Sequence, residues 1–190
     1  MIRSFIAFDL ENEDTIENIK NFSERIIRIQ PNLKLIKSEN IHLTIKFLGD
    51  IKESIAPLIY NILDKEINKI FFSDKPYIFK LENVGNFKNY SIIWINLEGY
   101  TDLIQEIKDI VEEKLHQKQN IKKDQRQKFN PHITIARLNR KKINYKTFSI
   151  FKKEIIKNKN KEFGEFYIKK IKLKKSVLTP KGPIYSELVY

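Results

Sequence analysis

The chain has 190 residues, and 36 Lys and Arg against 24 Asp and Glu give it a net charge of +12. Hydrophobic residues make up 41% of the chain, which argues against wholesale disorder, and the absence of cysteine excludes disulfides, thiolate nucleophiles and cysteine–zinc sites. The positive charge favours a polyanionic partner, RNA or DNA first, although a lysine-rich surface without specific function would give the same excess.

No segment indicates secretion or membrane insertion. The apolar run at the N-terminus is too short, and too soon followed by acidic residues, to be a signal peptide. No apolar run approaches the ~20 residues that a membrane helix needs. We therefore expect a single domain over residues 1–190, monomeric and cytoplasmic, with no membrane partner.

Apolar spacing and turn residues predict strands and helices in alternation through the first half of the chain. Pro31 ends the first helix, Pro57 lies in the first turn of the second, and Gly85-Asn86 joins the last two strands as a hairpin. The expected elements are a strand over 3–9, a helix over 14–30, a strand over 41–48, a helix over 54–70, and strands over 77–84 and 91–97.

The second half continues the alternation. The polar stretch 117–128 has no apolar period and is expected to be a mobile loop. The expected elements are a helix over 101–116, a strand over 133–138, a helix over 145–157, a strand over 165–175 and a strand over 184–189. Interspersed strands and helices without a Gly- or Ser-rich linker predict an α+β fold with antiparallel sheets.

Two of the three histidines lie in nearly identical tetrapeptides, His42-Leu-Thr-Ile45 and His132-Ile-Thr-Ile135. A His-x-Thr pattern in a strand places the histidine and the threonine on one face and the residue between them on the other. Near neutral pH one imidazole can be neutral and the other protonated. Two such strands facing each other therefore predict acid–base chemistry on a phosphate, with the hydroxyls of Thr44 and Thr134 donating to its oxygens.

The same motifs and the residues near them allow other interpretations. A zinc or iron site needs three or more ligands, and no carboxylate or further histidine has ligand spacing near either motif, so no metal is expected. His116, at the end of a predicted helix, is interpreted as exposed and not catalytic. Lys46 is expected to be solvated. Arg137 could bind a phosphate or form a structural ion pair, since strict alternation points it away from His132.

The segments His42-Leu-Thr-Ile-Lys-Phe-Leu-Gly49 and Pro131-His-Ile-Thr-Ile-Ala-Arg137 resemble the paired motifs of the two-histidine phosphoesterases. The chain is most similar to the RNA 2′,3′-cyclic phosphodiesterases, also called 2′-5′ RNA ligases. Further similarity covers Arg3–Leu10, Asn86-Phe87 with Ile92–Trp94, and Ser176–Tyr185. The resemblance implies a bilobal α+β fold, with two antiparallel sheets related by pseudo-twofold symmetry around a central cleft and helices on the outer faces.

The resemblance also implies hydrolysis of RNA 2′,3′-cyclic phosphate ends to 2′-phosphates without metal or cofactor. The physiological substrate stays open: a tRNA fragment, another cleaved RNA or a small cyclic nucleotide. His42 would be the proton donor and His132 the acceptor, with Thr44, Thr134 and Arg137 binding substrate. Two alternatives stay open: ligation of RNA halves, and RNA binding without catalysis. The role of Arg126 is uncertain from its spacing, and Phe47 and Tyr185 could stack on a base or belong to the core.

Overall fold

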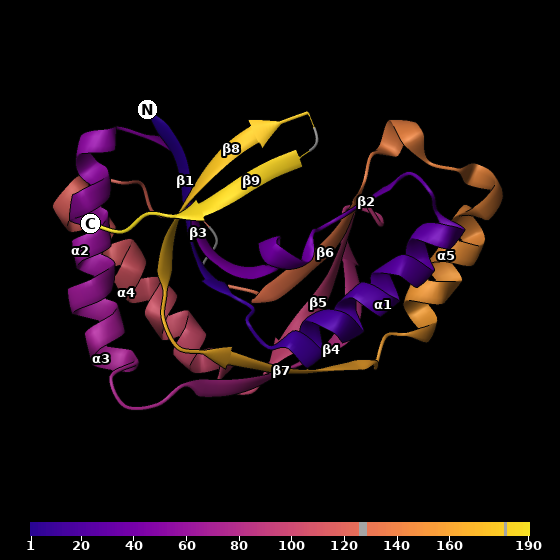
Figure 1. The fold of residues 1–190 in the computed structure, drawn as a ribbon, viewed down its shortest axis with the longest axis horizontal. Helices are drawn as coiled ribbons and strands as arrows, with labels where there is room; N and C mark the ends of the chain where they lie inside the picture. The colour runs from indigo at the N-terminus through magenta and orange to yellow at the C-terminus, as the bar shows by residue number, and fades with distance from the viewer. Residues whose placement is uncertain (126–128, 181) are drawn as a thin grey trace.

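The computed structural model describes residues 1–125, 129–180 and 182–190 (Figure 1). The strands are β1 (Ile2–Asp9), β2 (Leu33–Leu35), β3 (His42–Ile51), β4 (Tyr77–Phe87), β5 (Ile92–Glu98), β6 (His132–Leu138), β7 (Glu162–Ile168), β8 (Lys172–Thr179) and β9 (Gly182–Glu187). The α-helices are α1 (Glu13–Ile29), α2 (Ala56–Leu63), α3 (Lys69–Phe71), α4 (Thr101–Gln119) and α5 (Tyr145–Lys157). Shorter helical turns are η1 (Ser38–Asn40), η2 (Glu53–Ile55), η3 (Asp64–Asn68) and η4 (Arg140–Lys142).

The strands form one curled antiparallel sheet in the order β7-β4-β5-β6-β3-β1-β8-β9, with β2 paired to β6 (Figure 1). The border between β6 and β3 divides the sheet into lobe A (β3, β1, β8, β9) and lobe B (β6, β5, β4, β7). At this border the register pairs Leu43 with Ile133. The predicted bilobal α+β fold is confirmed, and the two expected sheets are the two halves of this one.

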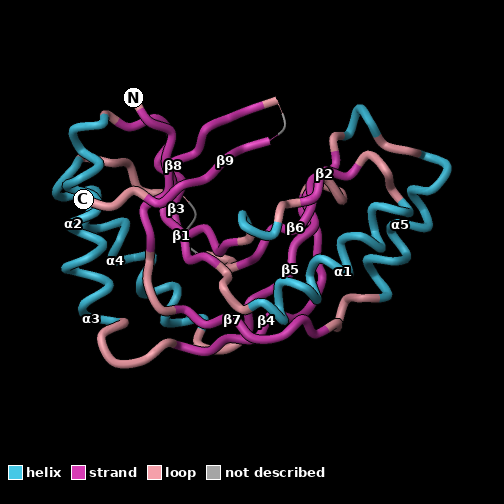
Figure 2. Tube along the Cα trace, in the orientation of Figure 1, coloured by secondary structure: helices cyan, strands magenta, loops and turns pink. Residues whose placement is uncertain are grey.

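The helices cover the two outer sides of the sheet, as Figure 2 shows. Helices α2 and α4 contact β8 and β3 of lobe A, whereas α1 and α5 contact β7 and β4 of lobe B. Apart from the short β2, the unit β1-α1-β3-α2 is repeated by β5-α4-β6-α5. In each unit the first helix crosses to the opposite lobe, which is the arrangement that pseudo-twofold symmetry requires.

Helix α1 illustrates how the sequence determines these elements. The side chain of Asn12 accepts a hydrogen bond from the backbone N–H of Thr15 (3.0 Å), which satisfies a donor of the first turn. Ile19, Phe22 and Ile26 recur at helical spacing and are buried. In the part of the chain that the structure describes, no helix combines the length and hydrophobicity needed to span a membrane.

The prediction of one strand over 165–175 is wrong. Strand β7 ends at Ile168 and pairs with β4 of lobe B, whereas β8 begins at Lys172 and pairs with β1 of lobe A. The chain therefore crosses between lobes at residues 169–171. Asn68 of η3 fixes this crossing, because its side chain accepts from the backbone N–H of Ile171 (2.8 Å) and donates to its carbonyl (3.1 Å).

The hairpin predicted at Gly85-Asn86 turns three residues later. Strand β4 continues to Phe87, and Gly85 pairs with Trp94 of β5. A Cβ on Gly85 would lie 2.2 Å from the Trp94 ring, so the glycine is needed for close packing and not for a turn. Asn86 instead supports the turn, because its side chain accepts from the backbone N–H of Tyr90 (3.1 Å).

Candidate active site

The two His-x-Thr motifs meet at the border between the lobes. Their central residues, Leu43 and Ile133, are paired, so the histidine of each motif lies beside the threonine of the other. Leu43 and Ile133 are fully buried, which places both histidines and both threonines on the opposite face of the sheet. The sequence repeat is thereby converted into one cluster with local twofold symmetry.

Each histidine is oriented by the same backbone contact. Nδ1 of His42 lies 2.6 Å from the carbonyl oxygen of Asn40, and Nδ1 of His132 lies 2.8 Å from that of Asn130. A carbonyl oxygen only accepts, so Nδ1 of each ring carries the proton and donates it. In a neutral ring Nε2 is then the basic nitrogen, and it is the atom through which each histidine can exchange a proton with a ligand.

Aromatic rings pack against both imidazoles. The ring of His42 lies 5.0 Å from that of Phe5 and 5.4 Å from that of Tyr185. The ring of His132 lies 4.9 Å from that of Phe87. Strand β5 contributes a second neighbour, Trp94, at 6.2 Å. This packing restricts both imidazoles to one orientation and partly shields them from water.

A β-bulge follows the threonine in each motif strand, at Ile45 in β3 and at the equivalent Ile135 in β6. A bulge adds one residue and so reverses the alternation of side chains beyond it. Arg137 therefore faces the cavity, although strict alternation points it away from His132. Phe47, at the equivalent position of β3, faces the same cavity.

The histidines and threonines line a cavity of about 870 Å³ between the lobes. This volume is in the range typical of small-molecule sites. The residues predicted for the site all line it: His42, Thr44, His132, Thr134 and Arg137, together with Phe47 and Tyr185. A second hollow of about 490 Å³ lies against η3 and α3 and includes none of these residues.

Burial lowers the pKa of His42 from its ordinary value of 6.5. The hydrogen bond to the Asn40 carbonyl and the carboxylate of Asp9, which lies across the β1–β3 register from His42, act in the opposite direction. The positive charges of Lys174 and Arg137 add to the lowering. His42 is therefore neutral near pH 7 when no ligand occupies the cavity.

Lys46 is not solvated, contrary to the sequence interpretation. It is 2% exposed and binds Glu112 of α4 (2.7 Å), which also binds Lys108 (2.6 Å). Lys108 in turn binds Asp124 (2.9 Å), and Lys46 lies 3.4 Å from the same carboxylate. We call these four residues the buried ion network.

The buried ion network fixes part of the stretch that was expected to be a mobile loop. Helix α4 extends to Gln119, and the carbonyl of Lys122 accepts from Lys46 (2.9 Å). On the far side of residues 126–128, Gln105 of α4 accepts from the backbone N–H of Phe129 (2.9 Å). Asp124 on one side and Phe129 on the other are therefore both attached to α4, through Lys108 and Gln105, and both residues line the cavity.

The remaining candidates lie apart from the cluster. His116 is exposed in the last turn of α4, as predicted, and its Nδ1 lies 3.3 Å from the carbonyl oxygen of Ile121. Arg126 lies outside the described residues. Within the described ranges, no three His, Asp or Glu side chains form a group that could hold a metal ion.

Sequence reasoning missed the residues that orient the histidines. Both motifs are preceded by asparagine at the same offset, Asn40 and Asn130, and this shared Asn-x-His-x-Thr pattern was visible in the chain. The aromatic neighbours Phe5, Phe87 and Trp94 carried no comparable pattern, because they reach the histidines only through strand pairing.

The comparison with protein families agrees with this geometry. Residues 4–186 match the family model described as AKAP7 2′5′ RNA ligase-like domain. The chain belongs to the two-histidine phosphoesterase superfamily. The matched range includes both His-x-Thr motifs.

Relatives of this two-histidine phosphoesterase carry a shared name. The RNA 2′,3′-cyclic phosphodiesterase of Methanocaldococcus jannaschii is 36% identical, over 97% of this chain and 96% of the relative. The protein of the same name from Archaeoglobus fulgidus is 30% identical, over 98% of both chains. The solved structure of E. coli LigT in its apo form has a TM-score of 0.70 at 16% identity and covers 99% of this chain and 95% of its own, which shows the shared fold.

Proposed function

We propose that this two-histidine phosphoesterase hydrolyses the 2′,3′-cyclic phosphate at an RNA end to a 2′-phosphate. The observation that carries the proposal is the cavity lined by two His–Thr pairs related by local twofold symmetry. The names of the relatives from Methanocaldococcus jannaschii and Archaeoglobus fulgidus support the same substrate. The test is to incubate the purified protein with an RNA that ends in a 2′,3′-cyclic phosphate, and a 2′-phosphate end is the expected product.

In the proposed mechanism a water molecule attacks phosphorus on the side opposite the 3′ oxygen. Nε2 of His132 accepts the proton of the water, and Nε2 of His42 gives a proton to the 3′ oxygen as its bond to phosphorus breaks. The products are a 3′-hydroxyl and a 2′-phosphate. The hydroxyls of Thr44 and Thr134 donate to the non-bridging oxygens, and the guanidinium of Arg137 balances the charge that develops there.

To act as the proton donor, the His42 ring must become protonated when substrate binds. Burial lowers the pKa of His42, so without substrate the ring is neutral near pH 7. The anionic phosphodiester favours the protonated ring and raises this pKa when it binds. His42 is therefore protonated, and able to donate a proton, only when substrate is bound.

A substrate with sulfur in place of the bridging 3′ oxygen tests the assignment. A thiol has a pKa of about 8.5, far below that of an alcohol, so the thiolate leaves without a proton donor. On this analogue we expect His42→Ala to recover turnover to within about tenfold of the unmodified protein. His132→Ala should stay at least about 100-fold slower on both substrates, since it lacks the base that activates water. The reverse pattern would exchange the two roles.

Ligation is the second candidate, favoured by the description of the matched family as 2′5′ RNA ligase-like. The displacement at phosphorus is the same, with the 5′-hydroxyl of a second RNA in place of water. Radiolabelled RNA halves, one ending in a cyclic phosphate and one beginning with a 5′-hydroxyl, separate the two reactions. Absence of joined product at high RNA concentration would exclude the ligase function.

We further propose a monomeric cytoplasmic enzyme whose substrates include tRNA fragments. The five site residues come from one chain, which supports activity without a partner subunit. Sedimentation of the purified protein during turnover tests this: a monomer is expected, and an active species found only as a dimer would contradict it.

A further inference from the structure

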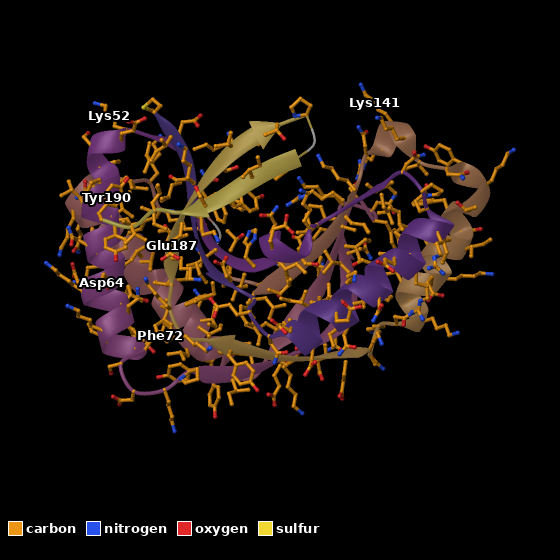
Figure 3. The ribbon with its side chains drawn as sticks, viewed as in Figure 1. Lys52, Asp64, Phe72, Lys141, Glu187 and Tyr190 are labelled. Carbon is orange, nitrogen blue, oxygen red and sulfur yellow. The ribbon has the colours of Figure 1, made fainter. Side chains whose placement is uncertain are left out.

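Three exposed basic residues, Lys34, Lys88 and Arg140, surround the lobe B side of the cavity, and we call them the basic edge. Lys34 of β2 and Lys88, in the turn after β4, line the cavity itself. Arg140 begins η4, immediately after β6. The three segments are distant in sequence and come together because β2 and β5 both pair with β6. Figure 3 shows Lys141, the neighbour of Arg140, at the outer rim of the same lobe.

Lys34 is held close to the site residue Arg137. The two lie directly opposite each other in the β2–β6 register, and both line the cavity. Like charges in this arrangement repel each other. The Lys34 ammonium also reaches across to lobe A, where a Cβ on Gly182 would lie 3.5 Å from its Nζ. An anion bound between Lys34 and Arg137 would replace this repulsion with two attractions.

Arg140 holds Lys88 at the cavity. Its Nη2 donates to the backbone carbonyl of Lys88 (2.7 Å), and its Nε donates to the hydroxyl of Ser91 (3.1 Å). Lys88, Asn89 and Tyr90 have φ of 50°, 52° and 63°, a left-handed conformation that side chains disfavour. Strain of this kind is concentrated at functional sites. These two hydrogen bonds use two of the five N–H groups of the Arg140 guanidinium. The remaining N–H groups are available to a ligand.

The basic edge carries three positive charges. In the parts of the chain that are described, no carboxylate forms an ion pair with Lys34, Lys88 or Arg140. Lys172 and Lys174 of β8 differ, because Asp9 binds both Lys174 (2.7 Å) and Lys172 (3.2 Å). Lys34, Lys88 and Arg140 thus place unpaired positive charge near Arg137, on the lobe B side of the cavity.

We propose that the basic edge binds the phosphates on the 5′ side of the reacting end, so that the preferred substrate is an RNA strand of several nucleotides and not a cyclic mononucleotide. The inference rests on the proposed function for its orientation, because a cyclic phosphate in the cavity is the 3′ end of the strand. The strand then leaves the cavity between Lys34 and Lys88 and passes Arg140.

The test compares substrates of different length. For the unmodified protein, kcat/KM should be at least about tenfold higher on an eight-nucleotide RNA with a cyclic phosphate end than on the matching cyclic mononucleotide. In the variant Lys34→Gln/Lys88→Gln/Arg140→Gln this preference should fall to near unity. The control removes the same charge from exposed lysines of η3 and α5, with Lys65→Gln/Lys153→Gln/Lys157→Gln, and should keep the preference. Equal loss in both variants, or no loss in the first, overturns the proposal.

A binding measurement tests the basic edge independently of the proposed hydrolysis. The probe is a fluorescent eight-nucleotide RNA with a terminal 2′-phosphate, titrated across a salt series. Each phosphate contact to single-stranded nucleic acid contributes about 0.7 to the slope of log K against log salt, so loss of three contacts should lower the slope by about 2. An unchanged slope overturns the basic edge even if hydrolysis occurs. A lowered slope in the triple variant, found together with no hydrolysis by the unmodified protein, supports RNA binding at the basic edge and contradicts the proposed hydrolysis.

Because Arg140 supports the turn, its removal could disturb Lys88 indirectly. The single variant Lys34→Gln avoids this, since no described side chain depends on Lys34 for a hydrogen bond. It should lower the length preference severalfold by itself. A preference equal to that of the unmodified protein would contradict the contact at Lys34.

Discussion

Replacing either His42 or His132 by alanine should lower kcat on an RNA cyclic phosphate by about 10²–10⁴-fold, the range that general acid–base catalysis contributes. Each substitution removes one of the two proton transfers, while the threonine hydroxyls and Arg137 remain. Both side chains are half-buried and stand on the cavity face of the sheet, so the core is unaffected. Turnover and urea unfolding of each variant provide the measurement.

The third histidine provides the matched control. His116 is exposed at the end of α4, outside the cavity, and His116→Ala should retain the turnover of the unmodified protein. The double variant lacking His42 and His132 should be little slower than either single variant, because residues that act as a unit are not additive. Near-normal turnover in either single variant would exclude the two-histidine mechanism.

The second large effect concerns stability. Glu112→Gln should lower the free energy of unfolding by about 3–5 kcal/mol, the cost of breaking a buried ion pair by removing one partner. Glu112 neutralises two nearly buried ammonium groups, those of Lys46 and Lys108, which are 2% and 4% exposed. Among the carboxylates that the structure describes, Asp124, which is partly exposed, would be the one left to balance them. Urea unfolding measures the difference.

The adjacent glutamate tests whether burial causes this effect. Glu113 also pairs with a lysine, Lys123, but both side chains are close to half exposed. Glu113→Gln should leave the urea midpoint almost unchanged, since exposed pairs contribute little. In a double-mutant cycle, Lys46→Met and Glu112→Gln together should cost less than the sum of the two single substitutions. Additive losses would show that the pair is not coupled.

Local patterns in the chain predicted the features that depend on neighbours in sequence. The spacing of Ile19, Phe22 and Ile26 defines α1, and the repeat of His-x-Thr defined the catalytic candidates, because alternation in a strand settles which side chains share a face. All five residues predicted for the site line one cavity. Their chemical roles stay predictions.

Features that depend on strand pairing could not be predicted in this way. The bulge at Ile45 arises in the pairing of β3 with β1, and the bulge at Ile135 in the pairing of β6 with β5. The bulge at Ile135 turns Arg137 toward the cavity. The break between β7 and β8 follows from pairing with different lobes, while residues 165–175 keep one β-prone pattern. Lys46 looked solvated because its partners Glu112 and Asp124 lie far along the chain.

The most direct test of the account is incubation of the purified protein, with and without EDTA, with a short RNA ending in a 2′,3′-cyclic phosphate. We expect a 2′-phosphate end, formed at the same rate in both samples, because two histidines carry the proton transfers. A 3′-phosphate product would contradict the assigned leaving group. Loss of turnover in EDTA, or no reaction in either sample, would contradict the metal-independent two-histidine mechanism.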